Sequence, residues 1–131
     1  MKLQQLSVFL ENAPGQLQLP IDALAKAGIN IVTLSLADTE QFGILRLIVE
    51  DPQKAQAVLE KVGCVVKVTD VLAIEVADQP GGLSHILNVV GKAGLNIEYM
   101  YAFTEKRSGK GLLVFRFSDS DAAIAALQTA N

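Results

Sequence analysis

Residues 12–31 read NAPGQLQLPIDALAKAGINI, and residues 78–97 read DQPGGLSHILNVVGKAGLNI. The second stretch repeats the first at a spacing of 66 positions, and eight of the twenty columns are identical. Farther along the spacing becomes 68, so that Gly43 matches Gly111 and Asp51 matches Asp119. Because self-similarity at a fixed spacing indicates duplicated structural units, we predict one unit repeated in tandem.

The apolar residues of each copy predict the same order of elements, βαββαβ. Strands are predicted from alternation of apolar and polar residues, and helices from apolar residues three or four positions apart. A glycine, Gly28 or Gly94, follows the first helix of each copy, and an aspartate, Asp51 or Asp119, precedes the second. The predicted strands are Leu6–Leu10, Asn30–Ala37, Ile44–Val49 and Cys64–Val68 in copy one, and Leu72–Val76, Asn96–Phe103 and Leu112–Phe117 in copy two.

This order predicts an α+β fold of two ferredoxin-like units, residues 1–69 and 70–131. Each would be an antiparallel sheet with both helices on one face, and the two sheets would lie side by side. The sequence stops at Asn131, before a counterpart of Cys64, so the second unit is expected to lack its last strand. Pro20 is expected in the first turn of its helix, where its missing amide costs no hydrogen bond.

The third strand of each copy predicts how the sheet is covered. Leu45, Leu47 and Val49 of copy one, like Leu113, Phe115 and Phe117 of copy two, should face the helices. The opposite face is still mostly apolar, and an exposed patch of that kind usually marks an interaction surface. We therefore expect a second sheet over it, most simply in a homodimer, although Arg46 and Arg116 could instead contact a ligand. The residues of this face are Ile44, Arg46, Ile48, Leu112, Val114 and Arg116.

Charge and hydropathy narrow the range of partners. The net charge is -3 and the pI is about 5.0, which argues against nucleic acid, since binding to a phosphate backbone needs a basic surface. The one basic cluster, Lys106, Arg107 and Lys110, is interpreted as a solvated hairpin tip. No apolar run is long enough for a signal peptide or a membrane span. We expect a cytoplasmic protein without a membrane or nucleic-acid partner.

Catalytic groups are sparse. The single histidine, His85, lies on a predicted helix and is interpreted as a surface residue, and the single cysteine, Cys64, lies in an apolar run. The carboxylates at helix starts are explained by capping. Nucleophile, phosphate-binding and zinc motifs are not found. We therefore expect no enzyme activity, no metal and no cofactor.

The turn between the first strand and the first helix, residues 11–17 and 78–83, is the chemistry that both copies share. Backbone amides at a helix N-terminus suit a carboxylate, and glycine lets a ligand approach closely. Asn12 and Asp78 could cap the helix or hold a ligand amine. The alternative is a capped helix with a rigid turn and no ligand.

These turns, followed at the same spacing by Ala-Gly-Ile-Asn-Ile in copy one and Ala-Gly-Leu-Asn-Ile in copy two, resemble the ACT domain, a regulatory domain that binds amino acids. Over nearly its full length the chain is similar to small stand-alone tandem ACT proteins of bacteria. The resemblance implies that units pair through their second strands and that an amino acid binds at the seam, between the turn of one unit and the second strand of the other.

Carried onto this sequence, the resemblance implies two sites. In the preferred site, Glu98 and the two tyrosines could contact the ligand side chain, whereas cross-strand packing is an equal alternative for the tyrosines. Its residues are Asn12, Ala13, Pro14, Gly15, Leu17, Asn96, Ile97, Glu98, Tyr99, Met100 and Tyr101. The second possible site comprises Asp78, Gln79, Pro80, Gly81 and Leu83, with Asn30, Ile31, Val32, Thr33 and Leu34.

We therefore expect a non-catalytic amino-acid sensor. The alternative is a protein-interaction subunit without its own ligand, which would regulate an amino-acid biosynthetic enzyme such as acetolactate synthase.

Overall fold

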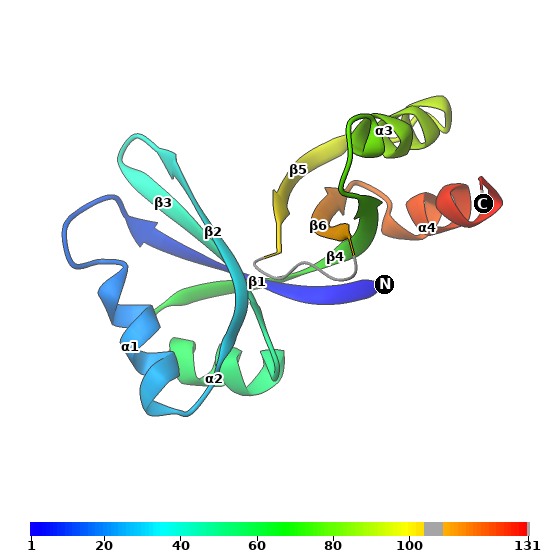
Figure 1. Cartoon of the computed structure of the whole chain (residues 1–131). Coiled ribbons are helices and arrows are strands. Elements are labelled where there is room, and N and C mark those ends of the chain that lie inside the picture. The colour runs from blue at the N-terminus through cyan, green and yellow to red at the C-terminus, as the bar shows by residue number, and fades with distance from the viewer. Residues whose placement is uncertain (104–108, 131) are drawn as a thin grey trace. The chain divides into compact units, whose positions relative to one another are not determined.

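The computed structural model describes residues 1–103 and 109–130. It divides into two compact units, which we call the first unit, Gln4–Thr69, and the second unit, Met1–Leu3 together with Asp70–Asn131. The six strands follow the order β2-β3-β1-β4-β6-β5, and β1 and β4 each contribute residues to both units (Figure 1). Within the described residues, no helix is long and apolar enough to cross a membrane.

The first unit has the βαββαβ arrangement that the repeat predicts. Its β1 pairs with β3 in antiparallel register, Leu6 opposite Leu47, and β2 pairs with β3, Leu36 opposite Leu45. The fourth strand of this unit is the beginning of β4. The elements are β1 (Lys2–Glu11), α1 (Gln18–Lys26), β2 (Ile31–Thr39), β3 (Phe42–Val49), α2 (Pro52–Lys61) and β4 (Val65–Ala77).

The helix ends in the first unit follow from local sequence. Pro20 is the third residue of α1, in the first turn, as predicted, where its missing amide leaves no carbonyl unpaired. Gly28 follows the helix with φ 71°, a left-handed conformation that glycine adopts without a steric penalty. Asp51 accepts a hydrogen bond from the Lys54 amide at 3.1 Å, so the predicted cap before α2 is confirmed.

The core of the first unit lies between its sheet and both helices. Leu45 and Leu47 of β3 are fully buried with Leu24 of α1 and Leu59 of α2, which confirms the predicted helix-facing side of β3. Val66 and Val68 of β4 pack against the same cluster. Both helices of this unit therefore cover one face of its sheet.

The second unit repeats this architecture. Phe115 and Phe117 are buried with Val90 of α3 and Ala123 of α4, and their rings stack with centroids 5.8 Å apart. Asp119 caps α4 through the Ala122 amide at 3.0 Å, again as predicted. The elements that complete this unit are α3 (Gly82–Lys92), β5 (Ile97–Ala102), β6 (Lys110–Phe117) and α4 (Ser120–Thr129).

The N-terminus of the chain pairs with the part of β4 that belongs to the second unit. The Met1 ammonium donates to the Ala73 carbonyl at 3.1 Å, and the Ala73 amide donates to the Met1 carbonyl at 2.8 Å. Lys2 adds ion pairs with Asp121 at 3.0 Å and with Asp70 at 3.8 Å. These contacts cover part of the edge of β4.

The expectation of two ferredoxin-like sheets side by side, the second without its last strand, is corrected to a single six-stranded sheet. The strand predicted to close copy one and the strand predicted to open copy two form one continuous strand, β4, of 13 residues. No turn separates them because residues 69–71 are Thr-Asp-Val, without the glycine or proline that marks a break. The start of β1, Lys2 and Leu3, then belongs to the second unit together with Met1.

Candidate functional site

The turn after β1 is tied to the β2–β3 hairpin by Asn12. The Asn12 side-chain amide donates to the Glu40 carbonyl at 2.9 Å, and the Asn12 backbone amide donates to the Gln41 carbonyl at 2.9 Å. Of the two roles left open for Asn12, capping the helix is not observed, since α1 begins at Gln18 and its N-cap, Leu17, has no side-chain cap. Asn12 instead fixes the turn against the end of β2.

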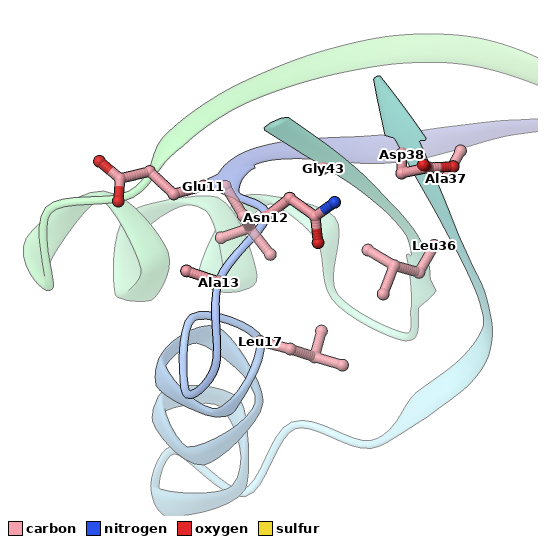
Figure 2. A pocket seen from close by; sticks show the side chains of 9 residues that line it. Glu11, Asn12, Ala13, Leu17, Leu36, Ala37, Asp38 and Gly43 are labelled. Carbon is pink, nitrogen blue, oxygen red and sulfur yellow. The ribbon is translucent and has the colours of Figure 1, made fainter. Parts of the chain in front are cut away.

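A pocket of about 190 Å³, which we call pocket I, opens beside this turn. Figure 2 shows Asn12 between the turn and the end of β2, with its side-chain oxygen on the side of Leu17 and Leu36, whereas the Glu11 carboxylate points away from them. The pocket is lined by Leu10, Glu11, Asn12, Ala13, Leu17, Leu36, Ala37, Asp38 and Gly43.

Pocket I brings together only part of the predicted site. Asn12, Ala13 and Leu17 line it, whereas Pro14 and Gly15 do not. Sequence reasoning missed the residues from the end of β2 and from Gly43, which strand pairing places next to the turn. The match between Gly43 and Gly111 in the repeat was the signal that could have identified this wall.

The second unit has a corresponding pocket of about 450 Å³, which we call pocket II. Four predicted residues line it, namely Asp78, Gln79, Pro80 and Leu83. The complete lining is Val76, Ala77, Asp78, Gln79, Pro80, Leu83, Gly111 and Leu113. Gly81 instead lines an adjoining pocket of about 350 Å³ that also contains Glu75 and His85.

Pockets I and II occupy the same place in the repeated unit. At the repeat spacing, Leu10, Asn12, Leu17 and Gly43 correspond to Val76, Asp78, Leu83 and Gly111, and all eight residues line their respective pockets. The hydrogen bond from the Asn12 amide to Gln41 also has its counterpart, from Asp78 to Gly109 at 3.2 Å. The turn and the following hairpin thus build the same concavity twice.

The glycines of the turn serve the backbone. Gly15 and Gly81 have φ of 84° and 90°, a region in which a side chain is strained. Gly82 is constrained in another way, because a Cβ at this position would lie 2.1 Å from the Ala77 carbonyl oxygen. Asp78 does not cap α3, whose N-cap is Gly81 without a side-chain cap. The paired glycines bring α3 against β4.

The β5 residues of the preferred site have contacts within the second unit. Arg116 lies with its Nε 3.5 Å from Glu98 Oε1, and its guanidinium donates to the Asp70 carbonyl at 2.8 Å. Arg116 therefore orders the sheet, and part of the Glu98 charge is already balanced. Asn96 and Met100 are exposed, and Ile97 packs against the core of the second unit.

The alternation along β5 places Tyr99 and Tyr101 on one side. Tyr99 lies opposite Arg116 and Tyr101 opposite Val114, whereas Met100 lies opposite the buried Phe115. Because directly opposed residues point to the same face of a sheet, the tyrosines lie on the face away from the helices. Met100 lies on the helix side.

The corresponding residues of β2 divide in the same way. Ile31 packs against the core of the first unit and Thr33 is buried, whereas Asn30 and Leu34 are exposed. A register irregularity interrupts the pairing of β2 between Ile31 and Thr33, and the pairing of β5 between Ile97 and Tyr99. Val32 and Glu98 therefore occupy equivalent bulge positions.

Cys64 and His85 lie outside the linings of pockets I and II. Burial raises the pKa of the Cys64 thiol, which keeps it protonated and a weak nucleophile, and His85 is exposed. Across residues 1–103 and 109–130, no group of three His, Cys, Asp or Glu side chains could hold a metal ion. Of the basic cluster, Lys106 and Arg107 lie outside the described residues, and Lys110 pairs with Glu75 at 3.6 Å.

Comparison with known proteins identifies relatives of the whole chain. The family model described as "ACT domain pair" matches residues 1–129. Protein BT0572 from Bacteroides thetaiotaomicron has a crystal structure that is 38% identical in sequence, with a TM-score of 0.92, and the match covers 99% of this chain and 89% of that one. No curated protein matches.

Two further structures share the fold at lower identity. The ligand-free regulatory subunit of aspartate kinase from Thermus thermophilus has a TM-score of 0.68 at 19% identity, covering 97% of this chain and 91% of that one. The corresponding subunit from Thermus flavus has a TM-score of 0.65 at 20% identity, covering 97% and 91%. At these identities the likeness shows the fold alone.

Proposed function

This chain belongs to the ACT domain pair family, and on that premise we propose that it is a non-catalytic regulatory protein that binds amino acids in pockets I and II. The observation that carries the proposal is the recurrence of one pocket at one place in both units. Because the same turn and the same glycine form this pocket in both units, ligand binding explains the pocket better than chance packing does.

The lining of pocket I suits a small zwitterion. Leu10, Leu17 and Leu36 supply an apolar wall for a side chain, while Asn12 and Asp38 supply polar atoms for an ammonium group. At roughly 30 Å³ for each water-sized group, a pocket of about 190 Å³ holds about six non-hydrogen atoms. That is the size of a small amino acid.

We further propose that each site is completed by a second copy of the chain. Strands β2 and β5 end the strand order, so each has one edge that is open to pairing. Next to these edges, Leu34 and Leu36 are 43% and 55% exposed, and Met100 is 37% exposed. Pairing of β2 with β5 of another copy would cover these side chains and bring the Asn96–Tyr101 strand to the Asn12 turn.

Such a dimer gives the ligand a way to act. A ligand changes an equilibrium only when it binds one arrangement better than another. An amino acid held between a turn of one copy and a strand of the other favours the paired arrangement, which a regulated partner could recognise.

A thermal-shift screen of the twenty amino acids tests the proposal. A ligand at about 100 times its Kd stabilises the folded state by roughly 2.7 kcal/mol, which corresponds to several degrees in Tm. Gly43→Val and Gly111→Val place a side chain in pockets I and II respectively, with a Cβ in ordinary contact, 3.6 Å from Leu36 Cδ1 and 3.8 Å from the Val76 oxygen. These variants should fold and lose the shift.

Gly91→Ala is the matched control, because Gly91 lies in α3 outside the linings of pockets I and II and has open space around it. It should keep the full ligand-induced shift. The proposal fails if no amino acid stabilises the chain, or if the double variant Gly43→Val/Gly111→Val responds as fully as the control.

A second candidate function is that of an interaction subunit for an amino-acid biosynthetic enzyme. Phe9 and Phe42 lie on the sheet face away from the helices and are 44% and 57% exposed. At the corresponding places of the second unit stand Glu75 and Lys110, an ion pair at 3.6 Å. The first unit thus has exposed apolar residues where the second unit has a charged pair, and an exposed apolar patch of this kind favours a docking surface for a partner protein.

Copurification from native extract separates the two candidates. A pure interaction subunit should retain an enzyme through Phe9 and Phe42 and lose it in Phe9→Glu/Phe42→Lys, which copies the pair of the second unit. If the variant retains every protein that the natural chain retains, this surface is not the docking site.

A further inference from the structure

Pockets I and II differ at one wall. Leu36 of β2 lies opposite Leu45, and Ala102 of β5 lies opposite Leu113, so the two residues occupy the same place in the repeat. Leu36 lines pocket I, with its Cδ1 3.6 Å from where a Cβ on Gly43 would lie. Ala102 is not among the described residues that line pocket II, and its methyl group has three carbons fewer than the leucine side chain.

A second difference has the same direction. Leu10 of pocket I is replaced by the shorter Val76 in pocket II. Ala13 of pocket I is replaced by the longer Gln79, which runs the other way, so the replacements of Leu36 and Leu10 are the ones that remove side-chain volume from pocket II, whose volume is about 450 Å³ against about 190 Å³ for pocket I.

We propose that the two pockets select amino acids by size, with Leu36 and Ala102 setting the limit. Pocket I binds an amino acid with a small aliphatic side chain, and pocket II binds one with an aromatic side chain. This inference rests on the proposed function, since it presumes that both pockets bind amino acids. The chain is then a sensor of two ligands.

The volumes assign the ligand classes. At roughly 30 Å³ per water-sized group, pocket II holds about fifteen non-hydrogen atoms, enough for a whole aromatic amino acid, whereas pocket I holds about six. Val76, Pro80, Leu83 and Leu113 give pocket II an apolar wall, against which a ring can pack.

The charge of the linings excludes amino acids with an acidic side chain from both pockets. Pocket I contains Asp38 and pocket II contains Asp78, and no lysine, arginine or histidine is among the described residues that line either one. A carboxylate on the ligand side chain would therefore lack a cation and face a like charge. Aspartate and glutamate should bind to neither pocket.

Reciprocal substitution tests the size limit. Calorimetric titration with alanine and with phenylalanine should show one site for each in the natural chain, with Gly43→Val removing alanine binding and Gly111→Val removing phenylalanine binding. Ala102→Leu should weaken phenylalanine binding at least tenfold, because a methylene-sized misfit in an apolar pocket changes affinity about 10- to 200-fold. Leu36→Ala should let pocket I accept phenylalanine, giving two sites for it.

Both substituted residues are exposed, so the variants should fold, and Gly91→Ala again serves as the control. The inference is overturned if Ala102→Leu keeps the phenylalanine affinity and Leu36→Ala gains no second site, while the natural chain still binds amino acids. If the natural chain binds neither alanine nor phenylalanine, the size assignment fails. If it binds none of the twenty, the proposed function fails with it.

Discussion

Replacing Gly82 with alanine should destabilise the second unit, because its helix α3 starts directly against β4. An added Cβ would lie 2.1 Å from the Ala77 carbonyl oxygen, 3.1 Å from the Ala77 carbonyl carbon and 3.3 Å from Val76 Cγ1. The first two neighbours are backbone atoms, so the clash is relieved only when α3 moves away from the strand. Overpacking of this kind costs about 3 kcal/mol, or roughly 10 °C in Tm for a chain of this size.

Gly91→Ala in the same helix gives the comparison. Gly91 has no atom within 4 Å of an added Cβ and no positive φ, so alanine should stabilise α3 by about 0.5–1 kcal/mol. Urea unfolding of both variants, followed by circular dichroism, measures the two changes. If Gly82→Ala unfolds at the same urea concentration as the natural chain, the second glycine of the turn is not required for helix–strand packing.

Three further predictions concern capping and titration. Asp51→Ala and Asp119→Ala each remove a side-chain cap, of the Lys54 and Ala122 amides, and should each cost about 1 kcal/mol in urea unfolding; equal loss in Lys54→Ala would contradict the capping role. Because burial raises the pKa of Cys64, the thiol should react with a disulfide reagent at pH 8 more slowly in the folded chain than in urea, and equal rates would refute this. The hydrogen bond and the ion pair that Lys2 makes with Asp121 raise the pKa of Lys2 above 10.5. The stabilisation from Lys2 is then present below that pH and is lost as the pH rises through the folded-state pKa. Lys2→Met should therefore lose less stability than the natural chain between about pH 10 and pH 12. Identical alkaline unfolding curves for the two proteins would contradict this prediction.

Local sequence predicted the elements of the fold because their signals are local. Gly28 with its positive φ and the Asp51 cap are decided by neighbours in the chain. The sharing of strands between the units was not predicted, because it depends on pairing between residues as distant as Met1 and Ala73. Pairing of this kind depends on which strand edge is still unpaired once the rest of the sheet has formed. The pattern of apolar and polar residues does not predict that edge.

The candidate site shows the same division. The turn was predicted as one wall, since its proline and glycine recur in both copies. The opposite wall of pocket I comes from β2 and Gly43. The Asn12 side chain donates its hydrogen bond to the carbonyl of Glu40, 28 positions away. A capping role for Asn12 looked reasonable from spacing alone, but the helix begins later, at Gln18. Sequence spacing could not reveal that a hairpin, rather than the helix, binds this side chain.

Backbone amide chemical shifts, recorded by NMR while the chain is titrated with whichever amino acid stabilises it most, test the account most directly. We expect the largest changes at residues 12–13, 36–38 and 43, or at residues 77–79, 83 and 111, according to the pocket that the ligand fills. Saturating shifts confined to other surfaces, or none with any of the twenty amino acids, would contradict a regulatory protein that binds its ligand beside the duplicated turn.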